Sequence, residues 1–437
     1  MKTRTLLLIS FLFLFFAPPL GQTGASSPGQ WAATTDYPLH VAGDSCATYS
    51  DQVYCVGGFD ANGNDYSSVY YAQLSPSGIG SWSTTSPYPE KVDSAACFTS
   101  GSALYCVGGE NATTVFNQVY EAPITSSGLG TWSEAAAYPS TIVSASCVAD
   151  SGYVYCVGGF NLKGEGSNST YYASVASGIG SWKRTTAYPV GVYTVPCAVQ
   201  SSVIYCVAGQ KEVRAGGTGP INNAPSNLVF FAPLSSAGIG AWSSSSAFPD
   251  YRSSASCLAS SGDVYCVGGY GRNQLSSETG FSSAVSAGGM GQWTEMSSYP
   301  IPFDLSSCVS GFSNIYCIAG RSFGTSGLTM LSSDYYIALG ASASTSSSSS
   351  TSTSSSTESQ STSSASSTEQ NSSSISSSSE NATSVSGSRT SGTAPEFPNA
   401  LAIPLLLVGA LLVVAILAPR GNRSTVGVSA ATGREPV

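Results

Sequence analysis

Six pairs of cysteines, each pair nine positions apart, set the rhythm of this 437-residue chain and use all twelve of its cysteines. A tyrosine directly precedes the second cysteine of every pair, and the six tryptophans recur with the same period. A period of about 50 residues predicts a chain built from repeated units that cannot fold singly. The pairs are Cys46/Cys55, Cys97/Cys106, Cys147/Cys156, Cys197/Cys206, Cys257/Cys266 and Cys308/Cys317.

One unit extends from Tyr37 to Trp82. Its apolar and aromatic runs predict strands at 44–48, 53–56 and 69–74, with a fourth beginning at Trp82. Gly, Ser and Pro residues separate these runs, and the pair Gly57-Gly58 ends the second. Four short strands per unit predict an all-β propeller blade and not a helical repeat.

The double glycine, an aromatic residue in the third strand (Tyr70) and the tryptophan in the fourth resemble the kelch repeat. The resemblance covers residues 31–340 and implies a six-bladed kelch-type β-propeller. Three units depart from the motif, at Ala208-Gly209, Phe281-Ser282 and Ala319-Gly320. The last unit lacks its tryptophan, whereas Gly29-Gln30-Trp31 stands alone at the start. We therefore expect the N-terminal strand to complete the final blade and leave no open sheet edge.

The constant cysteine spacing places each pair across the hairpin of strands one and two, which predicts six disulfides within blades. We expect Cα separations of about 5.5 Å, and each bridge to stabilise its blade by about 2–3 kcal/mol. An even cysteine count behind a secretory signal favours oxidation. The alternatives are bridges between blades and metal ligation, although no histidines accompany the cysteines.

The ends of the chain predict a cell-surface, single-pass membrane protein with an extracellular N-terminal domain. We expect a signal peptide at 1–21, the propeller at 31–340, a Ser/Thr-rich stalk at 341–398, a transmembrane helix at 399–419 and a cytoplasmic tail at 420–437. Pro395–Pro398 resembles a sorting signal of archaeal surface proteins. Sequons predict glycosylation at Asn111, Asn168, Asn371 and Asn381.

Charged residues make up 9% of the chain, against roughly 25% in an ordinary soluble protein, and the formal net charge is −9. No basic stripe is present that could displace counterions, so nucleic-acid binding is excluded. An uncharged surface of this kind would tolerate an acidic external medium.

Loops after strands two and four share one face of a propeller, and only these loops differ among the units. The opposite turns repeat as Ser-Gly-Ile-Gly or a close variant, whereas unit four inserts residues at 210–227. We therefore expect an extracellular protein or glycan ligand to bind the variable-loop face, although drift also varies loops. The candidate ligand-binding residues are Phe59, Glu110, Phe160, Gln210, Arg214, Tyr270 and Arg321.

The repeated Tyr-Pro dipeptides are interpreted as core packing, with sugar stacking by exposed rings as the alternative. They begin at Tyr37, Tyr88, Tyr138, Tyr188 and Tyr299, with Phe248 in unit five.

No catalytic constellation or cofactor site is found, and the chain is not predicted to be an enzyme. Kelch relatives include copper oxidases, but copper sites of that kind need histidines and His40 is the only one. Two sets remain open: a convergence of Arg252, Arg272 and Arg321, and a carboxylate pair drawn from Asp60, Asp65, Glu110 and Glu165. The alternative functions are an envelope component without a discrete ligand and a carbohydrate-active enzyme with an unrecognised site.

Overall fold

A computed structural model describes residues 29–160, 165–214 and 221–339, which belong to one compact unit. The predicted signal peptide, stalk, membrane helix and tail lie outside the described residues, as do Asn371 and Asn381. Within the described ranges, no helix has the length and apolar character needed to cross a membrane.

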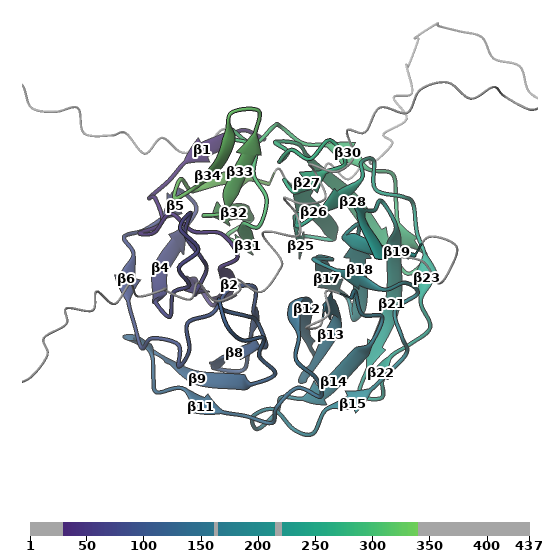
Figure 1. Cartoon of the computed structure of the whole chain (residues 1–437), viewed down its shortest axis with the longest axis horizontal. Coiled ribbons are helices and arrows are strands. Elements are labelled where there is room, and N and C mark those ends of the chain that lie inside the picture. The colour runs from purple at the N-terminus through teal and green to yellow at the C-terminus, as the bar shows by residue number, and fades with distance from the viewer. Residues whose placement is uncertain (1–28, 161–164, 215–220, 340–437) are drawn as a thin grey trace, which may run out of the picture. The chain divides into compact units, whose positions relative to one another are not determined.

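The described chain is all-β, and six sheets of four or five strands stand around one axis (Figure 1). The first strands are β2 (Ser45–Tyr49), β7 (Ala96–Ser100), β12 (Val143–Asp150), β17 (Cys197–Gln200), β25 (Ser256–Ser260) and β31 (Ser307–Gly311). The second strands are β3 (Gln52–Val56), β8 (Ala103–Val107), β13 (Tyr153–Phe160), β18 (Val203–Val207), β26 (Asp263–Val267) and β32 (Asn314–Ile318).

The outer half of each sheet is built from a long third strand and a short fourth one. The third strands are β4 (Val69–Ser75), β9 (Val119–Thr125), β14 (Thr170–Ser174), β21 (Val229–Ser235), β28 (Gly280–Ser286) and β35 (Tyr335–Ala338). The fourth strands are β6 (Ser83–Thr84), β11 (Ser133–Glu134), β15 (Lys183–Arg184), β23 (Ser243–Ser244), β30 (Thr294–Glu295) and β1 (Trp31–Ala33). The predicted strand positions therefore hold to within one or two residues.

The ring closes through the contacts of its first strands. β2 contacts β7, β7 contacts β12, and the contacts continue through β17, β25 and β31 back to β2. The N-terminal strand β1 pairs antiparallel with β35, with Trp31 opposite Ile337, and so completes the last sheet. The sheets remain separate and no single closed sheet is formed among the described residues, an arrangement consistent with a β-propeller.

The hydrophobic cores lie between neighbouring sheets, and the repeated Tyr-Pro aromatics are part of them. All six of these rings are at most 4% exposed. Each meets a tryptophan edge-on at a centroid distance of 4.8–5.0 Å. The interpretation as core packing is confirmed, and the sugar-stacking alternative is wrong for these six residues.

All six predicted disulfides form between strands one and two of one sheet, and the alternative of bridges between blades is wrong. The bonds are Cys46–Cys55, Cys97–Cys106, Cys147–Cys156, Cys197–Cys206, Cys257–Cys266 and Cys308–Cys317. Six disulfides indicate an extracellular or secreted environment.

The expected Cα separation of 5.5 Å is wrong for every one of these bonds, since the observed values are 4.0–4.1 Å. The paired cysteines lie directly opposite each other in narrow cross-strand pairs. In such pairs the backbone groups do not bond to the opposite residue, and the Cα atoms come within about 4.5 Å.

The second-strand cysteines are core residues and offer no surface to a ligand. Each is at most 1% exposed, and none of them lines the cavity on the axis that is described below. Their role is therefore structural in every sheet. These residues are Cys55, Cys106, Cys156, Cys206, Cys266 and Cys317.

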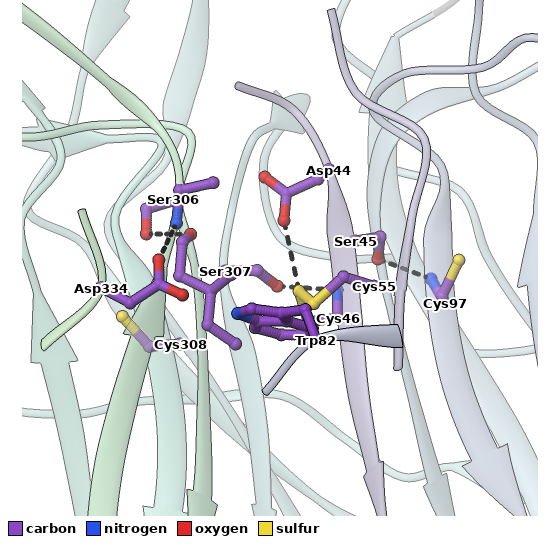
Figure 2. The surroundings of a disulfide bond; sticks show 12 residues. Asp44, Ser45, Cys46, Cys55, Trp82, Cys97, Ser306, Ser307, Cys308 and Asp334 are labelled. Carbon is purple, nitrogen blue, oxygen red and sulfur yellow. Dashed lines mark hydrogen bonds between the residues drawn. A yellow bond between two sulfur atoms is a disulfide. The ribbon is translucent and has the colours of Figure 1, made fainter. Parts of the chain in front are cut away.

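In four of the six sheets, the backbone N–H of the first-strand cysteine donates a hydrogen bond to a serine of the neighbouring sheet. The Cys46 N–H donates to Ser307 Oγ at 2.8 Å, which joins the first sheet to the last, and the Cys97 N–H donates to Ser45 Oγ at 3.0 Å (Figure 2). Cys197 and Cys308 repeat the bond with Ser146 and Ser256. Where Ala96 or Pro196 replaces the serine, this bond cannot form because the side chain has no acceptor.

The uniform turns of the opposite face are packed against the preceding sheet. Four of them form short strands that pair back onto strand three: β5 (Gly78–Ile79), β10 (Gly128–Leu129), β22 (Gly238–Ile239) and β29 (Gly289–Met290). The Ile79 N–H donates to Thr34 Oγ1 at 2.6 Å, and a Cβ added to Gly78 would collide with that threonine. These turns are uniform because they carry the contact between sheets.

Candidate functional site

The six predicted positions after the glycine pair form a ring on the variable-loop face. Each pairs antiparallel with the residue that lies four positions before the first cysteine of its unit. The pairs are Phe59 with Ala42, Glu110 with Asp93, Phe160 with Val143, Gln210 with Tyr193, Tyr270 with Ser253 and Arg321 with Asp304. The structure thus brings these residues together around the axis as expected.

Three of these pairs are extended by additional strands that sequence reasoning missed. The insertion in unit four forms a hairpin of β19 (Gln210–Arg214) and β20 (Ile221–Pro225), and β16 (Val192–Tyr193) pairs with β19. Arg214 lies at the far end of this hairpin, opposite Ile221. In the next two units β24 (Arg252–Ser253) pairs with β27 (Tyr270–Gly271), and β33 (Arg321–Gly324) with β34 (Gly327–Met330).

Two of the candidate aromatic residues pack against neighbours. Phe160 is 6% exposed and meets Tyr193 at a centroid distance of 5.1 Å, so its ring offers little surface to a ligand. Tyr270 meets Phe323 edge-on at 6.3 Å. Phe59, Glu110 and Gln210 are partly exposed.

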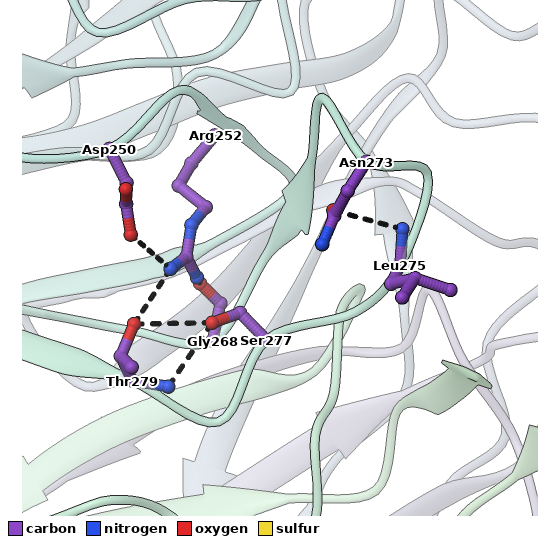
Figure 3. A network of polar contacts seen from close by, with 7 residues as sticks. All are labelled: Asp250, Arg252, Gly268, Asn273, Leu275, Ser277 and Thr279. Atoms are coloured by element: carbon purple, nitrogen blue, oxygen red, sulfur yellow. Dashed lines mark hydrogen bonds and ion pairs between the residues drawn. The ribbon is translucent and has the colours of Figure 1, made fainter. Parts of the chain in front are cut away.

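The three arginines do not converge. Arg321 forms a 2.7 Å ion pair with Asp304, which is fully buried. Arg252 is also buried, and its guanidinium donates to the Gly268 carbonyl, Thr279 and Asp250 at 2.7–2.9 Å (Figure 3). Arg272 is exposed and stacks on Tyr251, with its guanidinium carbon 3.2 Å from the ring centroid. Two of the three therefore hold loops in place, and Arg272 with Tyr251 forms an exposed platform on the variable-loop face.

Three carboxyl groups from separate loops come together beside the axis: Asp65, Asp93 and Glu110. Burial raises the pKa of Asp93 well above its ordinary value; a hydrogen bond from Ser94 opposes this, and the neighbouring carboxyls raise the pKa further. Burial and the neighbouring carboxyl groups therefore favour the protonated form of Asp93. Asp93 was missing from the sequence-based set because nothing in its local sequence marks it.

The other two candidate carboxylates do not join this group. Asp60 folds back on its own loop and accepts hydrogen bonds from the Asn62 and Asn64 amides at 2.9 Å. Burial acts to raise the pKa of Asp60, but these and two side-chain hydrogen bonds together lower it. Glu165 lies in a partly exposed loop of unit three.

A closed circuit of backbone hydrogen bonds surrounds the axis just inside these loops. One residue from each sheet donates its N–H to the carbonyl of the preceding sheet at 2.8–3.3 Å, and the N–H of Gly43 closes the circuit on Leu305. All six adopt the left-handed conformation, with φ between 48° and 69°. The residues are Gly43, Ser94, Ser144, Thr194, Ser254 and Leu305.

This circuit lines a cavity of about 170 Å³ on the axis. The lining is rich in serine and threonine hydroxyls and contains one charged side chain, Asp44. Asp44 is 7% exposed, and its Oδ1 atom and the Thr194 Oγ1 atom are buried without a hydrogen-bond partner in the described structure. Burial raises the pKa of Asp44 to about 8.

A second buried aspartate faces the joint between the last and first sheets. Asp334 is fully buried; its Oδ1 accepts from the Ala319 amide at 3.0 Å, whereas its Oδ2 has no partner among the described residues. Burial raises the pKa of Asp334 well above its ordinary value, and Asp44 raises it further. Figure 2 shows both aspartates near the Cys46–Cys55 disulfide. Asp334 directly precedes the third-strand aromatic residue of its unit, a position that valine occupies in three other sheets (Val69, Val119 and Val229). An aspartate in place of valine was a signal that the sequence offered.

Metal ligation by the cysteines receives no support. One group in the described ranges is compact enough to hold a metal, Asp44 with Cys46 and Cys55. Its two sulfurs are joined in a disulfide, so they offer no thiolates. Of the two sequons in this region, Asn168 is exposed, whereas Asn111 Nδ2 donates to the Lys91 carbonyl at 3.2 Å.

Comparisons with known proteins bear on the fold alone. No protein-family model matches the chain, and no curated protein matches it. Among solved structures the chain is similar to YjhT, with a TM-score of 0.55 and 13% sequence identity over 68% of this chain and 95% of that one. The likeness supports a β-propeller-type fold, and the described residues give no positive sign of catalysis.

Proposed function

We propose that the chain is a six-bladed, kelch-type propeller held at the cell surface by its C-terminal segment, and that it binds an extracellular protein or glycan through the variable-loop face. The segment at 399–419 is proposed as the membrane anchor on its apolar composition. The stalk at 341–398 would place the propeller away from the membrane.

One observation carries this proposal: the two faces are built differently. The turns of one face bond to the preceding sheet and repeat from unit to unit. The other face carries the hairpins β19–β20 and β33–β34 and the platform of Arg272 on Tyr251. Differentiated loops on a uniform scaffold are where recognition is usually built, and an exposed arginine stacked on an aromatic ring suits polar ligands.

Binding of the purified full-length chain to glycan and extracellular-protein arrays tests the proposal. We expect retention of a small set of ligands, weakened at least tenfold by Arg272→Ala and by Tyr251→Ala. Phe312 is 49% exposed on the opposite face, so Phe312→Ser is the matched control and should leave retention unchanged. The proposal would be contradicted if no ligand is retained, or if Phe312→Ser loses retention while Arg272→Ala and Tyr251→Ala keep it.

The cluster formed by the carboxyl groups of Asp65, Asp93 and Glu110 supports a second candidate function, that of a carbohydrate-active hydrolase. A carboxyl group with a raised pKa, such as that of Asp93, can supply an acid, and a neighbouring carboxylate can supply a base. Turnover of a neutral glycoside by the full-length chain, lost in both Asp93→Asn and Glu110→Gln, would support it. A structural role in the cell envelope predicts neither retention nor turnover, but incorporation into a regular lattice.

A further inference from the structure

The central cavity has the donor set of a small cation site. Asp44 is its only ionisable lining residue, and the Asp44 Oδ1 and Thr194 Oγ1 atoms lack a partner among the described residues. Ser144 and Ser254 also line the cavity. Asp44 Oδ2 lies 3.2 Å from the Cys46 sulfur, which belongs to a disulfide and has no hydrogen to donate. A carboxylate left in this position without a counter-charge is costly.

The backbone cannot supply that counter-charge. The six N–H groups around the axis are all used in the closed circuit, as are the six carbonyls that accept from them. Among the residues that the structure describes, no lysine, arginine or histidine lines the cavity. An anion would therefore meet a carboxylate and no positive group, so the lining excludes anionic ligands.

We propose that this cavity binds one monovalent cation, Na⁺ or K⁺, with Asp44 as its charged ligand and the serine and threonine hydroxyls and water as neutral ligands. Oxygen donors of this kind suit hard cations. One carboxylate balances one positive charge, whereas sites for Ca²⁺ usually supply several carboxylates. At about 30 Å³ per water, the cavity holds the ion and about four or five waters.

The proton is the natural competitor of the cation. The groups that act on Asp44 across the joint are Tyr37 and Asp334, both buried. All three groups are neutral when protonated. At low pH the Asp44 carboxyl is therefore protonated and does not bind the cation, and it becomes a ligand as it ionises. Cation affinity should therefore increase with pH.

Thermal denaturation of the full-length chain tests the proposal. NaCl or KCl would replace tetramethylammonium chloride at constant ionic strength, at pH 5 and at pH 9. We expect a saturable rise in the melting temperature at pH 9, at least tenfold weaker apparent binding at pH 5, and no saturable rise in Asp44→Ala. Alanine occupies this position in three other sheets, at Ala95, Ala145 and Ala255, so the variant should fold.

The Asp334→Val variant is the matched control because Asp334 does not line the cavity, and it should keep the response. Line broadening of ²³Na⁺ by the wild-type chain, absent with Asp44→Ala, is a second readout that does not depend on stability. An equal response of wild type and Asp44→Ala, no saturable response at pH 9, or stabilisation by a neutral polyol in place of the cation would each overturn the proposal.

Discussion

Replacing Asp44 by alanine should remove the pH dependence that this residue gives to stability. The pKa of Asp44 rises from 3.8 to about 8 in the folded chain because the carboxyl is buried. A raised pKa means that the folded state holds the proton more tightly than the unfolded state. The contribution of Asp44 to stability is therefore fully present below about pH 4 and is lost as the pH rises to about 8.

The size of this loss follows from the shift. About four pKa units at 1.36 kcal/mol each correspond to about 5–6 kcal/mol, an upper value since water entry and relaxation lessen the cost of a buried charge. At about 2 °C per kcal/mol for a domain of this size, the melting temperature should fall by up to about 10 °C between pH 4 and pH 9 through this residue alone.

Melting curves of wild type and Asp44→Ala, recorded from pH 4 to pH 9 in buffers without Na⁺ or K⁺, measure the effect. Asp93 and Asp334, whose pKa values are also raised, are present in both proteins, so the difference between the two curves measures the ionisation of Asp44 together with its effect on Asp334. We expect the melting temperature of the alanine variant to increase steadily relative to that of wild type as the pH rises. Parallel curves would refute the reasoning, because they would show that Asp44 ionises as freely in the folded chain as in the unfolded one.

Three further changes have expected outcomes. Asp334→Val should lower the free energy of unfolding at pH 7 by about 1–3 kcal/mol, measured in urea, because it leaves the buried Ala319 N–H without an acceptor; a gain would contradict this. Gly78→Ala should lower the free energy of unfolding by about 1–3 kcal/mol, because Gly78 has a left-handed φ and an added Cβ would collide with the preceding sheet. Gly262 also has a left-handed φ but has open space around it, so Gly262→Ala should lower the free energy of unfolding by less. Equal losses in the two variants would count against the collision. Tyr138→Phe should leave stability unchanged or higher in the same assay, since its buried hydroxyl has no described partner and Phe248 fills the same place in another sheet; a loss above about 1 kcal/mol would imply a hidden partner.

The sequence predicted those features that repeat as residue types. The cysteine spacing gave the hairpin of strands one and two, and the tryptophan period gave the aromatic contacts between sheets. The unpartnered Trp31 predicted that the first strand pairs within the last sheet. Each of these depends on a side chain whose chemistry is the same in every copy.

The circuit around the axis could not be predicted in this way because its members share a backbone conformation and not a side chain. A glycine, three serines, a threonine and a leucine occupy equivalent places. Their constant position three residues before the first cysteine was the available signal. The cluster of the Asp65, Asp93 and Glu110 carboxyl groups could not be predicted for another reason. Its members come from three loops, and only the assembled ring brings them together.

The circuit also determines which part of the molecule can distinguish ligands by charge. Each of its six N–H groups donates to the carbonyl of the preceding sheet, so none of them is left free at the axis. A propeller mouth of this kind has no counterpart of the positive end of a helix. Any preference for ligand charge at the centre must come from side chains, and among the described residues that line the cavity Asp44 alone is ionisable.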